Sequence, residues 1–280
     1  MEVQRLWLAT LTKNKANAGT GAGPLNLTVN VDGEDVVDKN FVFMTAEGPF
    51  TSIGPDSDWL GRGQAALETE PAVLETNGLT NSSIRLGIRD DDAWGPQHAL
   101  VLGSTARGVI ALAMETDLDR WLSTDPSEGK LSMPLRLVSQ GSSTTLIRRV
   151  IVLAYTESGD SPTDSPIQLE ITAGGTLVLE QKIPDTSQDD LEEYTSNWYF
   201  VDAPVPFTRG DVLANGGIRI RILGKDAWTP HRLFVYGLDT AEGRPNEVVH
   251  LVSMPTWDLG ALSMDTSEGS PFVELPVTGG

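Results

Sequence analysis

Two stretches of the chain carry one pattern, IRLGIRDDDAWGPQHALVLG at residues 84–103 and IRIRILGKDAWTPHRLFVYG at residues 218–237. They align without a gap at a shift of 134 residues and are identical at 9 of 20 positions. Such self-similarity at a fixed spacing predicts an internal duplication. In each copy an alternating apolar strand leads into an acidic turn with Asp-Ala-Trp-x-Pro. A second apolar strand follows and ends at Gly.

The duplication predicts two domains in the 280 residues, because a chain of this length can build two cores. We expect repeat one at 1–138, a small polar linker at 139–145 and repeat two at 146–280. The 28 Gly and 17 Pro residues favour many short strands joined by tight turns. The predicted fold class is all-β, with two tandem, duplicated, eight-stranded antiparallel β-sandwiches.

Alternating apolar and polar residues mark the expected strands in both copies. PLNLTVNV at 24–31 has PIQLEIT at 166–172 as its counterpart, and both precede turn residues and a further strand. Two loops of one type follow the duplicated stretch, LSTDPSEG at 122–129 and LSMDTSEG at 262–269. We expect other strands at 5–12, 36–43, 108–114, 176–183 and 247–254, and a short helix at 185–194.

The net charge of −19 argues against nucleic acid as a partner. It is shared between the halves, at −8 for residues 1–138 and −11 for the remainder. A negative field repels phosphate backbones, so no nucleic acid is expected to bind. The charge suits a soluble surface whose molecules repel one another, with recruitment of cations as the alternative.

The chain contains no cysteine, which excludes disulfides and thiolate metal sites. The N-terminus, MEVQRLWLATLTKNK, lacks the basic and apolar regions of a signal peptide. We expect a cytoplasmic origin, or release by lysis or a dedicated secretion route. The final location stays open.

Three segments resemble the PLAT domain, the β-sandwich of the polycystin, lipoxygenase and alpha-toxin family. They are AGT at 18–20, FTRGDVL at 207–213 and GIRIRIL at 217–223. The resemblance implies an eight-stranded sandwich that does no chemistry and docks to membranes or partner proteins, in several members with calcium. Gly21 stands where the family has a calcium-binding Asp, whereas the second copy has Asp164.

Calcium is the one cofactor that the loops suggest, since it takes six to eight oxygen ligands from carboxylates and carbonyls. The candidate ligands are Asp90, Asp91 and Asp92 in the first copy and Asp226 in the second. The loop carboxylates Asp125, Glu128, Asp265 and Glu268 are further candidates. We favour a turn for these loops, in which the Asp caps backbone N–H groups and Gly269 supplies a positive φ.

The duplicated tryptophans Trp94 and Trp228, with Pro96 and Pro230, are the candidate binding residues. An indole at a loop tip can anchor a partner or a membrane interface. It can also close the end of a sandwich, where it would bury a large apolar area. Retention in both copies favours the packing role, because both domains need a core, whereas a partner need not be shared by both.

Catalytic motifs are weak. Gly159-Asp160-Ser161 is similar to the turn of a lipolytic hydrolase, but His98, His231 and His250 lie in no matching motif. We therefore expect a non-enzymatic binding or assembly protein, a structural component that contacts other subunits or copies of itself. The strands at 5–12 and 132–138 are expected to lie at open edges and pair with a neighbour. The alternative is a calcium-dependent lipid or membrane docking protein.

Overall fold

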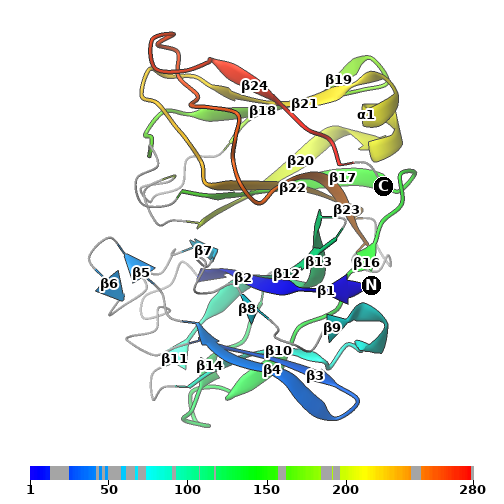
Figure 1. Cartoon of the computed structure of the whole chain (residues 1–280), viewed down its shortest axis with the longest axis vertical. Helices are drawn as coiled ribbons and strands as arrows, with labels where there is room; N and C mark the ends of the chain where they lie inside the picture. Colours follow the sequence, from blue (N-terminus) through cyan, green and yellow to red (C-terminus); the bar gives the residue numbers. More distant parts are fainter. Residues whose placement is uncertain are drawn as a thin grey trace. The chain divides into compact units, whose positions relative to one another are not determined.

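The computed structural model describes most of the chain (Figure 1). Side chains and backbone are described within residues 1–10, 25–40, 74–89, 93–106, 108–116, 118–156, 162–183, 191, 197–240 and 247–278. Backbone alone is described at 11–12, 41, 44–45, 48–49, 58–60, 67–68 and 196. These residues are almost all strands and turns, with one α-helix among them, which confirms the all-β class. They form two compact units, Met1–Val138 (unit 1) and Ser139–Gly280 (unit 2).

Unit 2 contains a five-stranded sheet and a four-stranded sheet. The five-stranded order is β16 (Ser139–Gln140), β23 (Glu247–Met254), β22 (Arg232–Leu238), β17 (Leu146–Tyr155) and β20 (Ser196–Thr208). The four-stranded order is β19 (Thr176–Lys182), β18 (Ile167–Ala173), β21 (Gly217–Ile222) and β24 (Phe272–Leu275). All neighbours are antiparallel except β16 and β23.

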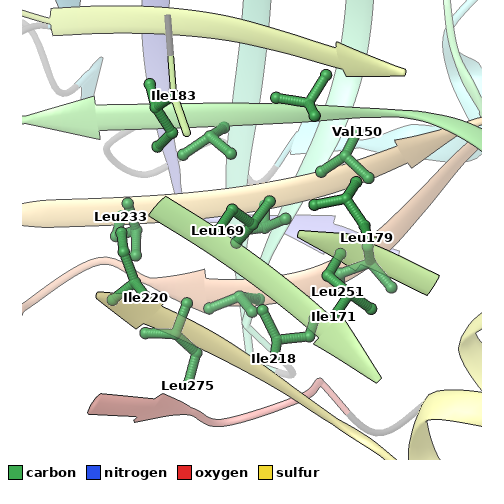
Figure 2. Packing of buried hydrophobic residues seen from close by; sticks show 14 of the residues in the cluster. Val150, Leu169, Ile171, Leu179, Ile183, Ile218, Ile220, Leu233, Leu251 and Leu275 are labelled. Atoms are coloured by element: carbon green, nitrogen blue, oxygen red, sulfur yellow. The ribbon is translucent and has the colours of Figure 1, made fainter. Parts of the chain in front are cut away.

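The core of unit 2 lies between these two sheets. Side chains from β17, β22 and β23 meet side chains from β18, β19, β21 and β24 in one buried apolar cluster (Figure 2). Strand alternation produces this arrangement, since every second residue of a strand points to the same face. In β18 the inward residues are Ile167, Leu169 and Ile171, while Gln168 and Glu170 point the other way.

Unit 1 has two sheets of the same sizes. One is ordered β13 (Gly108–Glu115), β12 (Pro96–Thr105), β2 (Arg5–Thr12) and β7 (Asp58–Leu60), and β8 (Leu67–Glu68) also pairs with β2. The other is ordered β15 (Ser132–Pro134), β10 (Ile84–Ile88), β3 (Leu25–Val31) and β4 (Glu34–Phe41). A second apolar cluster, from Val3 to Leu135, lies between them.

The strand orders of the two units correspond. The order β13-β12-β2-β7 corresponds to β23-β22-β17-β20, and β15-β10-β3-β4 corresponds to β24-β21-β18-β19. The duplicated stretch supplies the same two strands in each unit, β10 and β12 or β21 and β22. Its final glycines also sit alike: Gly103 pairs with Leu6 of β2, and Gly237 pairs with Val150 of β17.

One segment differs from expectation, and one helix was not predicted. Residues 5–12 form β2, which is a central strand because β12 pairs on one side and β7 and β8 on the other. Sequence order could not reveal this position, since the partner strand begins at Pro96. Residues 209–215 form the helix α1 (Arg209–Asn215), which begins at a capping box made by Thr208 and Asp211.

Smaller elements complete the described chain. β1 (Glu2–Val3) pairs with β9 (Leu74–Glu75), β5 (Met44–Thr45) with β6 (Gly48–Pro49), and β11 (Ala93–Trp94) with β14 (Leu122–Ser123). The 3₁₀ turn η1 covers Thr76–Gly78. The helix expected at 185–194 lies almost wholly outside the described residues.

Candidate functional site

The duplicated tryptophans are buried within their own units. Trp94 is 0% exposed and belongs to the core of unit 1, and Trp228 is 1% exposed and belongs to the core of unit 2. The indole N–H of Trp228 donates to Thr156 Oγ1 at 3.3 Å. Pro96 and Pro230 are buried as well. Side chains in these positions pack the core and present no open face to a partner.

Each tryptophan forms a β-bridge with the first residue of the recurring loop of its own unit, at 122–129 or 262–269. Trp94 pairs with Leu122 across β11 and β14. Trp228 forms the equivalent bridge to Leu262, with N–H···O distances of 2.8 Å in both directions. The two elements that recur most clearly in the sequence therefore contact each other in both units.

The two loops, STDPSEG at 123–129 and SMDTSEG at 263–269, have the same internal hydrogen bonds. Asp125 Oδ1 accepts from the backbone N–H and the hydroxyl of Ser127, at 2.8 and 2.7 Å. Asp265 accepts the same pair from Ser267, at 2.9 and 2.7 Å. Because one carboxylate oxygen in each loop caps two donors, these aspartates serve the turn that we favoured from the sequence.

The glycine of each loop is required for close packing rather than for a positive φ. Gly129 and Gly269 are absent from the described residues with positive φ. A Cβ at Gly129 would lie 2.6 Å from the carbonyl oxygen of Trp121, and one at Gly269 would lie 2.3 Å from that of Ala261. The expectation of a positive φ at Gly269 was therefore wrong.

The hydrogen bonds of the loops also change their acidity. Donation from the Ser127 backbone and hydroxyl lowers the pKa of Asp125, and donation from the Ser267 hydroxyl and backbone lowers the pKa of Asp265. A carboxylate that accepts several hydrogen bonds is favoured in its charged form. Both loops are thus best formed when their aspartates are ionised.

Asp226, the calcium candidate of the second copy, is exposed. Its Oδ2 accepts the backbone N–H of Asp164 at 3.1 Å, and its carbonyl oxygen accepts from the Thr163 hydroxyl at 3.2 Å. Among the residues that the structure describes, no three His, Cys, Asp or Glu side chains gather as a metal site. Asp90, Asp91 and Asp92 lie outside those residues, so calcium binding there stays a prediction.

Sequence reasoning missed a cluster on the outer face of the four-stranded sheet of unit 2. We call it the Phe272 cluster, and it consists of Glu170, Arg219, Arg221, Phe272 and Glu274. Both guanidinium groups lie over the ring of Phe272, at 4.4 Å for Arg219 and 5.5 Å for Arg221. Arg221 Nε donates to Glu170 at 2.9 Å, and Arg219 Nε donates to Glu274 at 2.7 Å.

The signal for this cluster is present in the sequence only as strand alternation. Arg219 and Arg221 are the outward residues of β21, and the pairing with β24 places Phe272 beside Arg221. β24 follows β21 by about fifty residues, which no local pattern could bring together. The hydrogen bond that Arg219 donates to Glu274 raises the pKa of the guanidinium, so this group stays charged.

Comparison with known proteins assigns the chain to no family. The sequence matches no known protein family and no curated protein. In the described parts of the chain, no helix has the length and apolar character needed to cross a membrane.

Proposed function

We propose that the chain is a non-enzymatic binding and assembly protein built from two duplicated, eight-stranded β-sandwiches. Its partners would be other protein subunits or further copies of itself. The observation that carries the proposal is the Phe272 cluster, an aromatic ring and two arginines held on an open sheet face. The corresponding strand orders of the two units support the duplication.

The Phe272 cluster has the residue composition of a protein contact surface, and its charged side chains are held in place by ion pairs. Aromatic residues and arginine are enriched in the residues that dominate binding energy. Phe272 is 37% exposed although it is a large apolar side chain. Ion pairs fix both arginines before any partner arrives, so little side-chain entropy would be lost on binding.

Unit 1 shows that the sheet itself does not need Arg221 and Phe272, although Arg85 stands in the place of Arg219. In the pairing of β10 with β15, Gly87 lies opposite Ser132, where unit 2 has Arg221 opposite Phe272. The same architecture is therefore built with small residues in unit 1 and with an aromatic and an arginine in unit 2.

Two of the sheet edges are protected against the addition of a further strand. β20, the last strand of its sheet, contains Pro204 and Pro206, which have no N–H to offer a further strand. β4, at the edge of its sheet in unit 1, carries Glu34, Asp35 and Asp38. Proline and charge at these edges oppose strand addition, and the proposed contact through Phe272 does not require it.

The proposal is tested by replacing Phe272 with the residue of unit 1, Phe272→Ser. Light scattering of the full chain should show assembly for the wild type, and the variant should assemble at least about tenfold less readily, as expected when a central aromatic contact is lost. Leu177→Ser is the matched control, because Leu177 is also exposed, at 51%, and lies on β19 outside the cluster. Equal assembly of wild type and Phe272→Ser would refute the role of the cluster.

One observation favours a second function, docking to a lipid surface with calcium. Leu223 and Met264 are exposed, at 44% and 49%, and the N–H of Met264 donates to the carbonyl of Gly224. These apolar side chains therefore lie near one another, close in the chain to Asp226. In this second proposal they would enter the interface of a bilayer. Sedimentation with anionic vesicles, with calcium and with chelator, tests it, and no calcium-dependent binding would exclude it.

A further inference from the structure

A cavity of about 390 Å³ lies in unit 1 beside the STDPSEG loop. Its size is that of a small-ligand site. The side chains that matter to the argument are Arg120, Trp121, Leu122, Glu128, Lys130 and Met133. All of them belong to one unit, so the cavity is complete within unit 1.

The lining separates into an apolar floor and a cationic rim. Leu122 and Met133 are buried, and the indole of Trp121 is half-buried between them and solvent. Arg120 and Lys130 are exposed at the rim. A flat apolar surface next to two cations suits a ring that carries a negative charge.

Within the described parts of the chain, neither Arg120 nor Lys130 forms an ion pair, whereas Arg89, Arg136 and Arg148 each have a carboxylate partner. Glu128, the acid of the lining, already accepts from the Ser123 hydroxyl at 3.1 Å.

Unit 2 shows that the loop can form without this lining. The backbone bond that closes the loop is the same in both units, from Lys130 N–H to Trp121 O at 3.1 Å and from Ser270 N–H to Ala261 O at 3.0 Å. Unit 2 therefore has Ala261 in the place of Trp121 and Ser270 in the place of Lys130. Gly260, the residue before Ala261, takes the place of Arg120. The indole and both cations are consequently additions to the loop and not requirements for folding.

We propose that this cavity binds a small organic carboxylate with a ring, the ring lying against Trp121 and the carboxylate between Arg120 and Lys130. The guanidinium can donate two parallel hydrogen bonds to a carboxylate, and the ammonium adds a second charge. The net charge of −19 repels anions at long range, so the local cations must provide the attraction. The ring can be aromatic or that of an acidic sugar, since both present an apolar face to an indole.

Ligand-observed NMR titration of the full chain tests the proposal with four probes. Benzoate and glucuronate carry the charge on an aromatic and a sugar ring, and benzamide and glucuronamide are their neutral counterparts. At least one acid should bind about tenfold or more tightly than its amide, which is the effect of one charge-assisted contact. The acid that binds identifies the kind of ring. Equal binding of acid and amide, or no binding of any probe at about 10 mM, overturns the proposal.

The residues of unit 2 supply variants that the loop tolerates. Arg120→Gly, Trp121→Ala and Lys130→Ser should each weaken binding of the acid by about tenfold, while the melting temperature falls by no more than a few degrees. Lys39→Ser is the control for charge, because Lys39 is exposed on β4 away from the cavity lining, and it should leave binding within about twofold of wild type. Undiminished binding by Trp121→Ala, or an equal loss in Lys39→Ser, would show that the cavity is not the site.

Discussion

Trp94 and Trp228 occupy equivalent buried positions, and their burial favours the packing role over the binding role. A ring in the core contributes through packing, and its loss leaves a large cavity. The residues that the sequence marked most strongly thus lie in the core, while the half-buried Trp121 and the exposed Phe272 carry the proposed contacts.

Truncation of the core tryptophans measures this packing. We expect Trp94→Ala to destabilise unit 1 and Trp228→Ala to destabilise unit 2, each by about 3–5 kcal/mol in urea unfolding. Trp121→Ala is the control, because that indole is half-exposed, and it should cost less than about 1 kcal/mol. Similar costs for all three variants would contradict the assignment of the first two to the core.

Asp125 and Asp265 make the stability of their loops depend on pH. Their pKa values in the folded chain are lowered from the ordinary 3.8, so the stabilisation is present above about pH 4 and is lost as the pH falls through the folded pKa. The double variant Asp125→Asn with Asp265→Asn keeps the acceptor oxygens but not the titration. Its melting temperature should fall less than that of the wild type between about pH 5 and about pH 3.

Glu34→Gln is the control for this pH effect, since it removes one carboxylate from the exposed face of β4. Its melting temperature should fall with pH as steeply as that of the wild type. Identical slopes for the wild type and the double variant would show that the two loops contribute nothing to acid unfolding.

At the scale of elements, alternation predicted the strands because it reports which residues share a face. The strands at 24–31, 166–172 and 247–254 form within a residue or two of expectation. Alternation does not report which strands are neighbours. The central position of β2 depends on β12, about ninety residues later, and the Phe272 cluster depends on a similarly distant pairing. The cavity beside Trp121 was missed for another reason, since only a comparison of the two loops reveals what unit 1 adds.

The strand glycines that end the duplicated stretch are explained by close packing between strands. A Cβ at Gly237 would lie 2.6 Å from two side-chain carbons of Ile147, and one at Gly103 would lie 2.8 Å from Leu112. Gly237→Ala and Gly103→Ala should therefore each cost about 1–3 kcal/mol of unfolding free energy. Gly217→Ala is the control, because its nearest atom is 3.6 Å away. If it destabilises as much as the other two, loss of strand flexibility rather than crowding is the cause.

At the scale of the whole molecule, two units with corresponding strand orders carry different surfaces. Unit 1 has the cationic cavity beside Trp121, and unit 2 has the Phe272 cluster. The proposed duplication, followed by divergence of exposed residues, would account for this difference, since both units have an apolar core between two sheets. The net charge of −19 then governs how copies approach each other, because like charges repel over a Debye length that shrinks with salt.

The proposed assembly is tested most directly by the mass of the full chain in solution, measured by light scattering at several protein concentrations. The measurement is repeated while the ionic strength is raised from about 0.01 M to about 0.15 M, which shortens the Debye length from about 30 Å to about 8 Å. We predict a defined multiple of the 30.1 kDa chain that holds or grows as salt rises, and that is diminished in Phe272→Ser. A species of 30.1 kDa at every salt and protein concentration would contradict self-assembly.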